Sequence, residues 1–274
     1  MQYLLNATGK RRLSRLVTGV APLYAFDFDG TLARIVHERY AAAMTEPVRA
    51  ALEELSGKAV TAIVSGRSLD DLRGRVNGVV PHMIGNHGME GLHTSPHVMH
   101  QAKECCRAWI KQMERFHPEL RRRAVSIEDK TYSLSMHYRE SSSPLQAKEL
   151  VVSVTAQLTP LPRLVPGKAV VNVIPPGTPH KGTAVLELMR QLECEAALYV
   201  GDDDTDEDVF SLPDERIVTV RIGKKVASGA RYYLKTQSEI VHLLGSLLQS
   251  YKGCLLYTSP SPRDISGSRM PSSA

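Results

Sequence analysis

The sequence predicts an α/β protein in which a Rossmann-like parallel sheet is interrupted by an inserted α+β domain. Short apolar runs alternate with helical patterns near both ends of the chain, which is typical of a parallel sheet with crossover helices. The alternation stops near residue 92 and resumes after Pro175-Pro176-Gly177. Acidic and small polar residues directly follow several apolar runs, which is where such sheets bind ligands.

Residues 20–91 are predicted to form the first half of the core. The run 23–28 ends in acidic residues and Gly30, as expected of a buried central strand that reaches a loop. Further expected elements are a helix at 45–57 with Pro47 near its start, a strand at 59–64, a short helix opened by a capping box of Ser68 and Asp71, and a strand at 79–84.

Residues 92–175 are expected to form the inserted α+β domain. A helix around 102–116 is followed by a strand pattern rather than by a return to strand-helix alternation. The strand pattern alternates one apolar and one polar face, namely Tyr132, Leu134, Met136 and Tyr138 against Ser133, Ser135, His137 and Arg139. A helix at 145–158 and a strand at 168–174 complete the expected insertion.

Residues 176–250 are expected to complete the core with a helix at 182–192, strands at 197–200 and 217–220, a short helix between them and a helix at 237–249. Two linkers then join the two domains, which predicts a hinge with a cleft between them. Residues 251–274 are rich in Ser and Pro and lack periodicity, so we expect a disordered tail, typical of translated cloning sequence.

Composition and charge favour an ordinary globular protein. Hydrophobic residues make up 42% and charged residues 23%, which argues against a disordered or fibrous chain. The net charge is +5, but the basic residues are scattered, so nucleic-acid binding is not expected. No apolar stretch predicts a signal or membrane helix, and four cysteines without a CxxC pair favour reduced thiols in the cytoplasm.

Acidic residues after two predicted strands indicate where chemistry occurs. Asp27 and Asp29 lie two residues apart, with Gly30 allowing a close approach to a ligand. Five further aspartates and a glutamate lie within 202–208, and such crowded acids need a cation, for which Mg²⁺ is the best match. The alternative is a plain turn at the first site and an acidic helix start at the second.

Two groups suited to phosphate follow in the expected loops or helix starts. They are Ser65-Gly66-Arg67, after the second strand, and His180-Lys181-Gly182, before the helix that opens the second half of the core. A hydroxyl, backbone amides and an ammonium can hold phosphate oxygens. Each group alone is equally consistent with an ordinary turn, but their order and placement favour a phosphate site.

The order of these motifs resembles that of phosphatases of the haloacid dehalogenase superfamily, whose fold is a Rossmann-like core with an inserted cap. The resemblance implies that Asp27 attacks phosphorus to give an aspartyl-phosphate, and that Asp29 acts as general acid and then general base. It implies Mg²⁺ held by Asp27, the backbone carbonyl of Asp29 and Asp202, with Asp206 nearby or binding through water, and with Ser65 and Lys181 on the phosphoryl oxygens.

Longer stretches resemble the trehalose-6-phosphate phosphatases, among them DFDGTLARI, SGRSLDDL, GNHGMEG, EDKTYSLSMHYR, PGKAVVNV, PHKGTA and GDDDTDEDVF. This resemblance implies a cytoplasmic enzyme of trehalose biosynthesis, a small sugar phosphate as substrate and a trehalose-phosphate synthase as partner. The substrate-contacting residues that we expect are Arg67, His87, Glu90, Lys130, His137, Arg139, Lys168 and Asn172.

The sugar contacts depart from the family pattern at two positions. Asn172 stands where glutamate is usual, and Ile174 stands where arginine is common. Phosphatases for sucrose phosphate, mannosylglycerate phosphate or a hexose phosphate therefore remain alternatives. A catalytically silent sensor is a further alternative, but it should have lost one of the motif acids, and none is missing.

The histidines His87, His93, His97 and His100 raise the alternative of a zinc site. Their spacing fits no regular zinc motif, and the segment is expected to be a loop. We therefore expect no zinc there.

Overall fold

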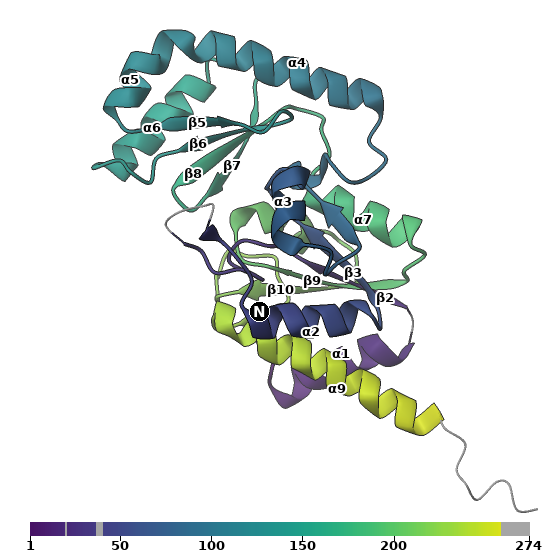
Figure 1. Ribbon diagram of the computed structural model, residues 1–274. Coiled ribbons are helices and arrows are strands. Elements are labelled where there is room, and N and C mark those ends of the chain that lie inside the picture. Colours follow the sequence, from purple (N-terminus) through teal and green to yellow (C-terminus); the bar gives the residue numbers. More distant parts are fainter. Residues whose placement is uncertain (20, 37–40, 259–274) are drawn as a thin grey trace, which may run out of the picture.

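The computed structural model describes residues 1–19, 21–36 and 41–258, with side chains for residues 1–16, 21–36 and 41–251. A seven-stranded parallel sheet has the order β1-β11-β10-β9-β2-β3-β4, which confirms the predicted α/β class (Figure 1). Its strands are β1 (Gln2–Tyr3), β2 (Pro22–Phe26), β3 (Val60–Val64), β4 (His82–Ile84), β9 (Ala196–Gly201), β10 (Ile217–Ile222) and β11 (Tyr232–Leu234).

Helices cover both faces of this sheet because its central strands carry apolar side chains on both faces. Along β2, Tyr24 and Phe26 pack on one face, whereas Leu23 and Ala25 pack on the other. The first face is covered by α1 (Ala7–Gly19), α2 (Glu46–Ser56), α3 (Leu69–Val76) and α9 (Ile240–Thr258), and the second by α7 (Lys181–Gln191) and α8 (Glu207–Phe210).

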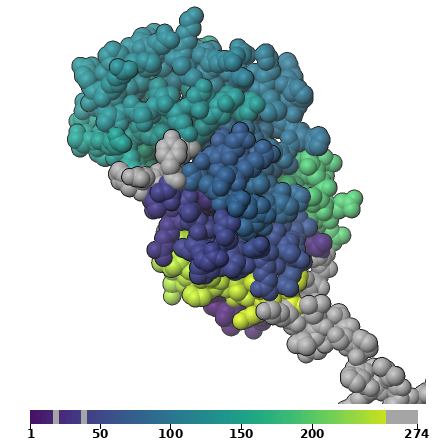
Figure 2. All heavy atoms as spheres, in the orientation of Figure 1, coloured from purple at the N-terminus to yellow at the C-terminus, as the bar shows by residue number. Residues whose placement is uncertain are grey.

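Residues 92–175, the expected insertion, contain a four-stranded antiparallel sheet of order β5-β6-β8-β7. Their elements are α4 (Pro96–Met113), α5 (His117–Arg122), β5 (Ser126–Asp129), β6 (Leu134–His137), α6 (Pro144–Thr155), β7 (Arg163–Gly167) and β8 (Val170–Ile174). One face packs under the helices around the fully buried Trp109. Figure 1 shows the other face turned toward the parallel sheet, and Figure 2 shows the insertion as a teal lobe above the rest.

Several local predictions are confirmed. The helix expected at 45–57 is α2, which Thr45 precedes and Gly57 follows, with proline in its first turn. The hydroxyl of Ser68 accepts a hydrogen bond from the amide of Asp71, as expected of a helix cap. The reciprocal half of the expected capping box is not formed, because the Asp71 carboxylate binds Arg67 and Arg75 instead.

Other elements differ from the prediction. The strand expected at 79–84 is shorter, and β5 and β7 were not predicted. Two elements precede residue 20, since β1 pairs with β11 and α1 packs near α9. The helix α9 continues to Thr258, into the expected tail; the rest of that tail, 259–274, lies outside the described residues.

Across the ranges that the structure describes, no helix is long and apolar enough to span a membrane.

Leu52 in α2 tests the packing of the parallel-sheet core. It is fully buried, so Leu52→Ala should lower the free energy of unfolding by roughly 2–5 kcal/mol. Leu145 lies in α6 and is 71% exposed, so Leu145→Ala should change it by less than about 0.5 kcal/mol. Denaturant titrations followed by circular dichroism measure both, and equal losses would contradict the assigned burial.

Candidate active site

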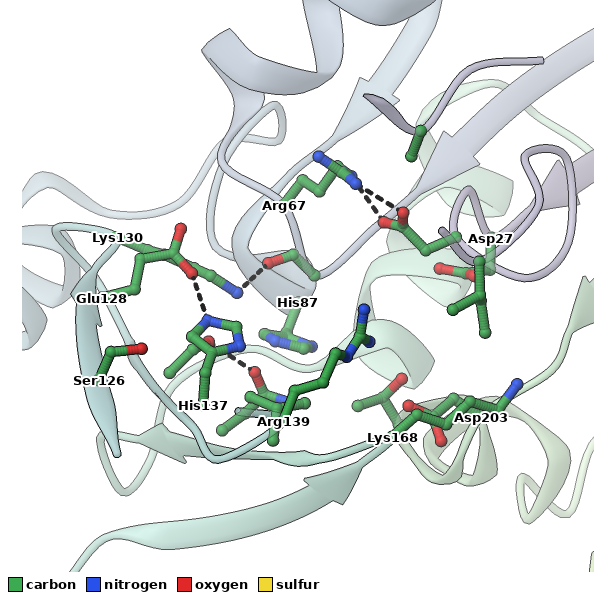
Figure 3. Close-up of a pocket in the computed structure, with 18 of the residues that line it drawn as sticks. Asp27, Arg67, His87, Ser126, Glu128, Lys130, His137, Arg139, Lys168 and Asp203 are labelled. Atoms are coloured by element: carbon green, nitrogen blue, oxygen red, sulfur yellow. Dashed lines mark hydrogen bonds and ion pairs between the residues drawn. The ribbon is translucent and has the colours of Figure 1, made fainter. Parts of the chain in front are cut away.

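The predicted chemical residues meet at the carboxyl edge of the parallel sheet. Asp27 follows β2, Ser65 follows β3 and Asp202 follows β9, and these three strands are neighbours. A cavity of about 690 Å³ lies between this edge and the insertion, and both contribute to its walls. Figure 3 shows Lys130, His137, Arg139 and Lys168 around the cavity, together with Asp27 and Arg67.

Lys181 joins two buried carboxylates at the floor of the site. Its Nζ donates to Oδ1 of Asp27 at 2.8 Å and to Oδ1 of Asp206 at 2.7 Å. All three side chains are less than a tenth exposed. The first turn of α7 places Lys181 here, and His180 caps that helix by accepting from the amide of Thr183.

Burial dominates the protonation of this cluster. It raises the pKa of Asp27 well above its ordinary value, and the Lys181 ammonium acts in the opposite direction. Burial would lower the pKa of Lys181, but the charges of Asp206 and Asp27 outweigh it and raise that pKa. Burial, aided by the charge of Asp206, raises the pKa of Asp202 to about 6. Lys181 is therefore a permanent cation.

Asp206 shapes the loop after β9. One carboxylate oxygen accepts from Lys181 and from the Tyr199 hydroxyl, and the other accepts from the amides of Asp202 and Asp203. A Cβ on Gly201 would lie 2.3 Å from the Asp206 carboxyl carbon, so only glycine fits there. With four donors on its two oxygens, Asp206 holds the loop and has little capacity left for direct ligation.

The acidic residues fit a hard divalent cation. Carboxylate oxygens of Asp27, Asp202 and Asp206 lie within 4.8 Å of one another. Oδ1 of Asp202 is buried and has no hydrogen-bond partner, which is costly unless another group binds it. Gly30, at φ 83°, leaves room for this carboxylate, since a Cβ there would lie 2.1 Å from its Oδ2. In the described part of the chain, the group contains these three aspartates and no histidine.

Asp29 lies beside the cluster and is held by Arg67. Nε and Nη2 of Arg67 donate to the two carboxylate oxygens of Asp29, both at 2.6 Å. The remaining guanidinium nitrogen of Arg67, Nη1, donates to the carboxylate of Asp71 at 2.6 Å. Figure 3 labels Arg67 and draws dashed lines from its guanidinium to a neighbouring carboxylate. Sequence reasoning expected Arg67 to contact substrate and gave no sign of this pairing.

The insertion reaches the sheet edge through two lysines. Lys168, in the turn between β7 and β8, donates to Oδ2 of Asp202 at 2.7 Å. Lys130 donates to the carbonyl oxygen of Gly66 at 2.9 Å. Both line the cavity, so the structure brings these predicted residues to the site. Arg139 also lines it and donates to the carbonyl oxygen of Val36 at 2.8 Å.

Polar groups of the insertion form the opposite wall. His137 and Glu128 interact at 2.9 Å, and both line the cavity. Asn172 accepts from the Ser135 hydroxyl at 2.8 Å and donates to the carbonyl of Val165 at 3.3 Å. The polar face expected on the strand around 134–137 is thus confirmed, and Ser133 and Ser135 on that face are buried.

His87 lies on the floor between these walls. Its Nε2 is buried without a hydrogen-bond partner. Burial, together with the charges of Lys130 and Lys181, holds the pKa of His87 well below its ordinary range, so its imidazole is neutral. Its backbone is left-handed, at φ 59°, a strain of the kind that is retained at functional sites.

Three predicted residues do not line the cavity, namely Asp206, which holds the loop after β9, Glu90 and Ser65. The Glu90 carboxylate accepts from the amide of Leu69, at the start of α3, and from the side chain of Asn86. Ser65 is buried, and its hydroxyl accepts from the amide of Arg67. Sequence reasoning also missed Tyr199, whose place in an apolar strand gives no sign that its hydroxyl reaches Asp206.

The chain has the haloacid dehalogenase fold. A parallel sheet carries Asp27, Lys181 and the 202–206 loop at its carboxyl edge, and an inserted antiparallel sheet lies over that edge. Residues 25–237 match the family model described as trehalose-phosphatase. The chain therefore belongs to the trehalose-phosphatase family.

Similar proteins include the trehalose-phosphate phosphatase of Mycobacterium ulcerans, 32% identical over 241 residues, which covers 82% of this chain and 61% of that protein. The trehalose-phosphate phosphatase of Mycobacterium tuberculosis is 30% identical over 227 residues, covering 75% and 58%. The chain thus spans about three fifths of the length of these relatives.

Solved structures share the fold. The C-terminal domain of the C. albicans trehalose-6-phosphate phosphatase superimposes with a TM-score of 0.70 at 21% identity, covering 91% of this chain and 98% of that one. A sucrose-phosphatase from Synechocystis, in complex with sucrose and phosphate, has a TM-score of 0.55 at 17% identity, covering 83% and 98%.

Lys181→Met tests the electrostatic role of Lys181. Removing the ammonium leaves buried carboxylates uncompensated, so the metal-free protein should lose about 3–5 kcal/mol of stability near neutral pH. An acid whose folded-state pKa is raised destabilises the fold above its unfolded pKa, and protonation relieves this as the pH falls. The loss should therefore shrink between about pH 8 and about pH 5.

The measurement is denaturant unfolding in a chelator at both pH values. Lys58→Met is the matched control, since Lys58 pairs with Glu54 at the surface and the change should cost at most about 1 kcal/mol. A loss that is small, or that grows as the pH falls, would refute the role given to Lys181.

Proposed function

We propose that this protein is a Mg²⁺-dependent phosphatase that hydrolyses trehalose 6-phosphate to trehalose and phosphate. The carrying observation is Asp27, held by Lys181 at the floor of a polar cavity, with the unpartnered oxygen of Asp202 beside it. Family membership and the names of the mycobacterial relatives support the substrate.

In the proposed reaction, a carboxylate oxygen of Asp27 attacks phosphorus and the bond from phosphorus to the sugar oxygen breaks. Lys181 occupies Oδ1 of Asp27, whereas Oδ2 accepts no hydrogen bond from the described residues and is the oxygen suited to attack. Asp29 gives its proton to the leaving sugar oxygen. Water then attacks phosphorus of the aspartyl-phosphate, Asp29 takes its proton, and phosphate leaves.

We propose Mg²⁺ as the cation because the side-chain donors are all carboxylate oxygens. Asp27 and Asp202 would hold it directly, with the backbone carbonyl of Asp29, and Asp206 would act through its hold on the loop or through water. When bound, the cation supplies charge neutralisation at the transferring phosphoryl group. Lys181 adds a second positive charge, and Ser65 is proposed as a phosphoryl contact that substrate binding would have to expose.

The cavity has the volume of a small-molecule site, and its wall offers groups that can bind sugar hydroxyls. Among the predicted substrate contacts we retain His87, Lys130, His137, Arg139, Lys168 and Asn172. The Asn172 amide already forms two hydrogen bonds within the insertion, with Ser135 and Val165, so its contribution to sugar binding should be modest. Glu90 is better suited to supporting Asn86 and α3 than to contacting substrate.

We also propose that residues 92–175 are a cap domain on a core formed by 20–91 and 176–250, to which β1 and α1 add. The two lysine contacts to the core support a cap that closes over the site. A cytoplasmic location and a trehalose-phosphate synthase as pathway partner, both carried over from the family, complete the proposal.

Phosphate release from a panel of sugar phosphates tests the reaction. With Mg²⁺, the wild type should prefer trehalose 6-phosphate over sucrose phosphate, mannosylglycerate phosphate and hexose phosphates. Asp27→Asn keeps the shape of the side chain but removes the nucleophile, so the rate should fall by at least about 10³-fold. Preference for another ester would refute the substrate, and a rate retained in Asp27→Asn would refute the mechanism.

Calorimetric titration with Mg²⁺ tests the cation site without an activity readout. Asp202→Asn should weaken binding about 10- to 100-fold or more, because it removes a charged ligand. Asp204→Asn is the matched control in the same loop: Asp204 binds Lys225 and lies outside the acidic group, so affinity should be nearly unchanged. Equal effects of the two changes would locate the cation elsewhere.

A further inference from the structure

Arg67 is buried, and its guanidinium forms ion pairs with two carboxylates. It forms a two-pronged pair with Asp29 and a further bond with Asp71, all three at 2.6 Å. Its side chain is 4% exposed and lies 5.6 Å from the centre of the Phe28 ring. Binding a phosphoryl group with this guanidinium would require breaking pairs that are shielded from water.

Asp71 is itself fixed by a second arginine. Nε and Nη2 of Arg75, one turn further along α3, donate to Asp71 at 3.0 and 2.8 Å. Nη1 of Arg75 donates to the carbonyl oxygen of Ala42 at 2.8 Å. Alternating charges thus run from Asp29 through Arg67 and Asp71 to Arg75, and anchor the first residue to a helix.

Asp29 needs such an anchor. It lies in the loop after β2, next to Gly30, and its side chain is 38% exposed, so its environment alone does not restrict it to one rotamer. A guanidinium fork fixes both the position and the plane of a carboxylate, which a single ammonium cannot do. A general acid must be held close to the leaving oxygen to be effective.

We propose that Arg67 is a positioning residue that orients Asp29 for proton transfer to the leaving sugar oxygen, rather than a contact to phosphate or sugar. The inference rests on the proposed phosphatase reaction. A positioning role for Arg67 differs from a phosphate-binding role in one respect. The loss of rate on removing Arg67 should depend on the leaving group, since only a poor leaving group needs the proton.

The test compares trehalose 6-phosphate with 4-nitrophenyl phosphate, whose nitrophenolate leaves without a proton. Arg67→Gln should lower kcat/KM for trehalose 6-phosphate by about 10²-fold, the usual contribution of general acid catalysis. It should change kcat/KM for 4-nitrophenyl phosphate only a few-fold. The comparison uses kcat/KM because this constant reports the steps up to loss of the leaving group and leaves out the later attack of water, in which Asp29 serves both substrates alike. Arg67→Lys should behave like Arg67→Gln, because lysine lacks the fork, whereas a residue that binds phosphate would tolerate lysine.

Arg73→Gln is the matched control on α3, since Arg73 is 60% exposed and pairs with the exposed Asp70. It should leave both substrates unaffected. Equal losses on the two substrates, no loss on either, or full activity in Arg67→Lys would overturn the proposal. If circular dichroism shows that Arg67→Gln does not fold, Asp71→Asn replaces it, because this change removes the anchor of Arg67. Asp71→Asn should also slow trehalose 6-phosphate more than 4-nitrophenyl phosphate, with a smaller difference between the two substrates. Equal losses on the two substrates in Asp71→Asn would also overturn the proposal.

The wild-type rate separates this inference from the proposed function. A wild type that is inactive on trehalose 6-phosphate would overturn the proposed substrate. The comparison would then use whichever sugar phosphate the wild type hydrolyses, and its outcome would still decide the role of Arg67.

Discussion

Carboxylates crowd the carboxyl edge of the parallel sheet, and the buried ammonium of Lys181 is the interaction that allows them to be there. Without it, Asp27 and Asp206 would face each other across a space that excludes water. Asp206 in turn fixes the loop after β9 through two backbone amides. One lysine therefore connects the nucleophile proposed after β2 with the cation site proposed after β9.

The insertion completes the site from above. Lys168 donates to Asp202, whose other carboxylate oxygen has no hydrogen-bond partner, and Lys130 binds the loop after β3. Both contacts join the insertion to the groups expected to hold the cation and the phosphate. The contact of Lys168 with Asp202 thus couples the charge balance at the floor of the site to the insertion, which gives the insertion a place in the proposed chemistry as well as in the proposed sugar recognition.

The chemical residues were predictable because their signals are local. Asp27, Lys181 and Asp202 each follow a recognisable strand or open a helix, and the parallel topology brings such positions together. The strand β7 was missed because Pro166-Gly167 resembles a turn, although proline is tolerated at the edge position that β7 holds. The Arg67–Asp29 pair joins residues 38 positions apart, and Glu90 accepts from the backbone amide of Leu69 and from the side chain of Asn86. No local pattern reveals either contact.

Covalent catalysis by Asp27 is the central claim, and trapping the intermediate tests it most directly. The protein would be mixed with trehalose 6-phosphate and Mg²⁺, quenched in acid during turnover and reduced with borohydride, which converts an aspartyl-phosphate to homoserine. Peptide mass spectrometry should then find homoserine at position 27 and not at position 29. Turnover without any modified aspartate, or modification at another residue, would contradict the account.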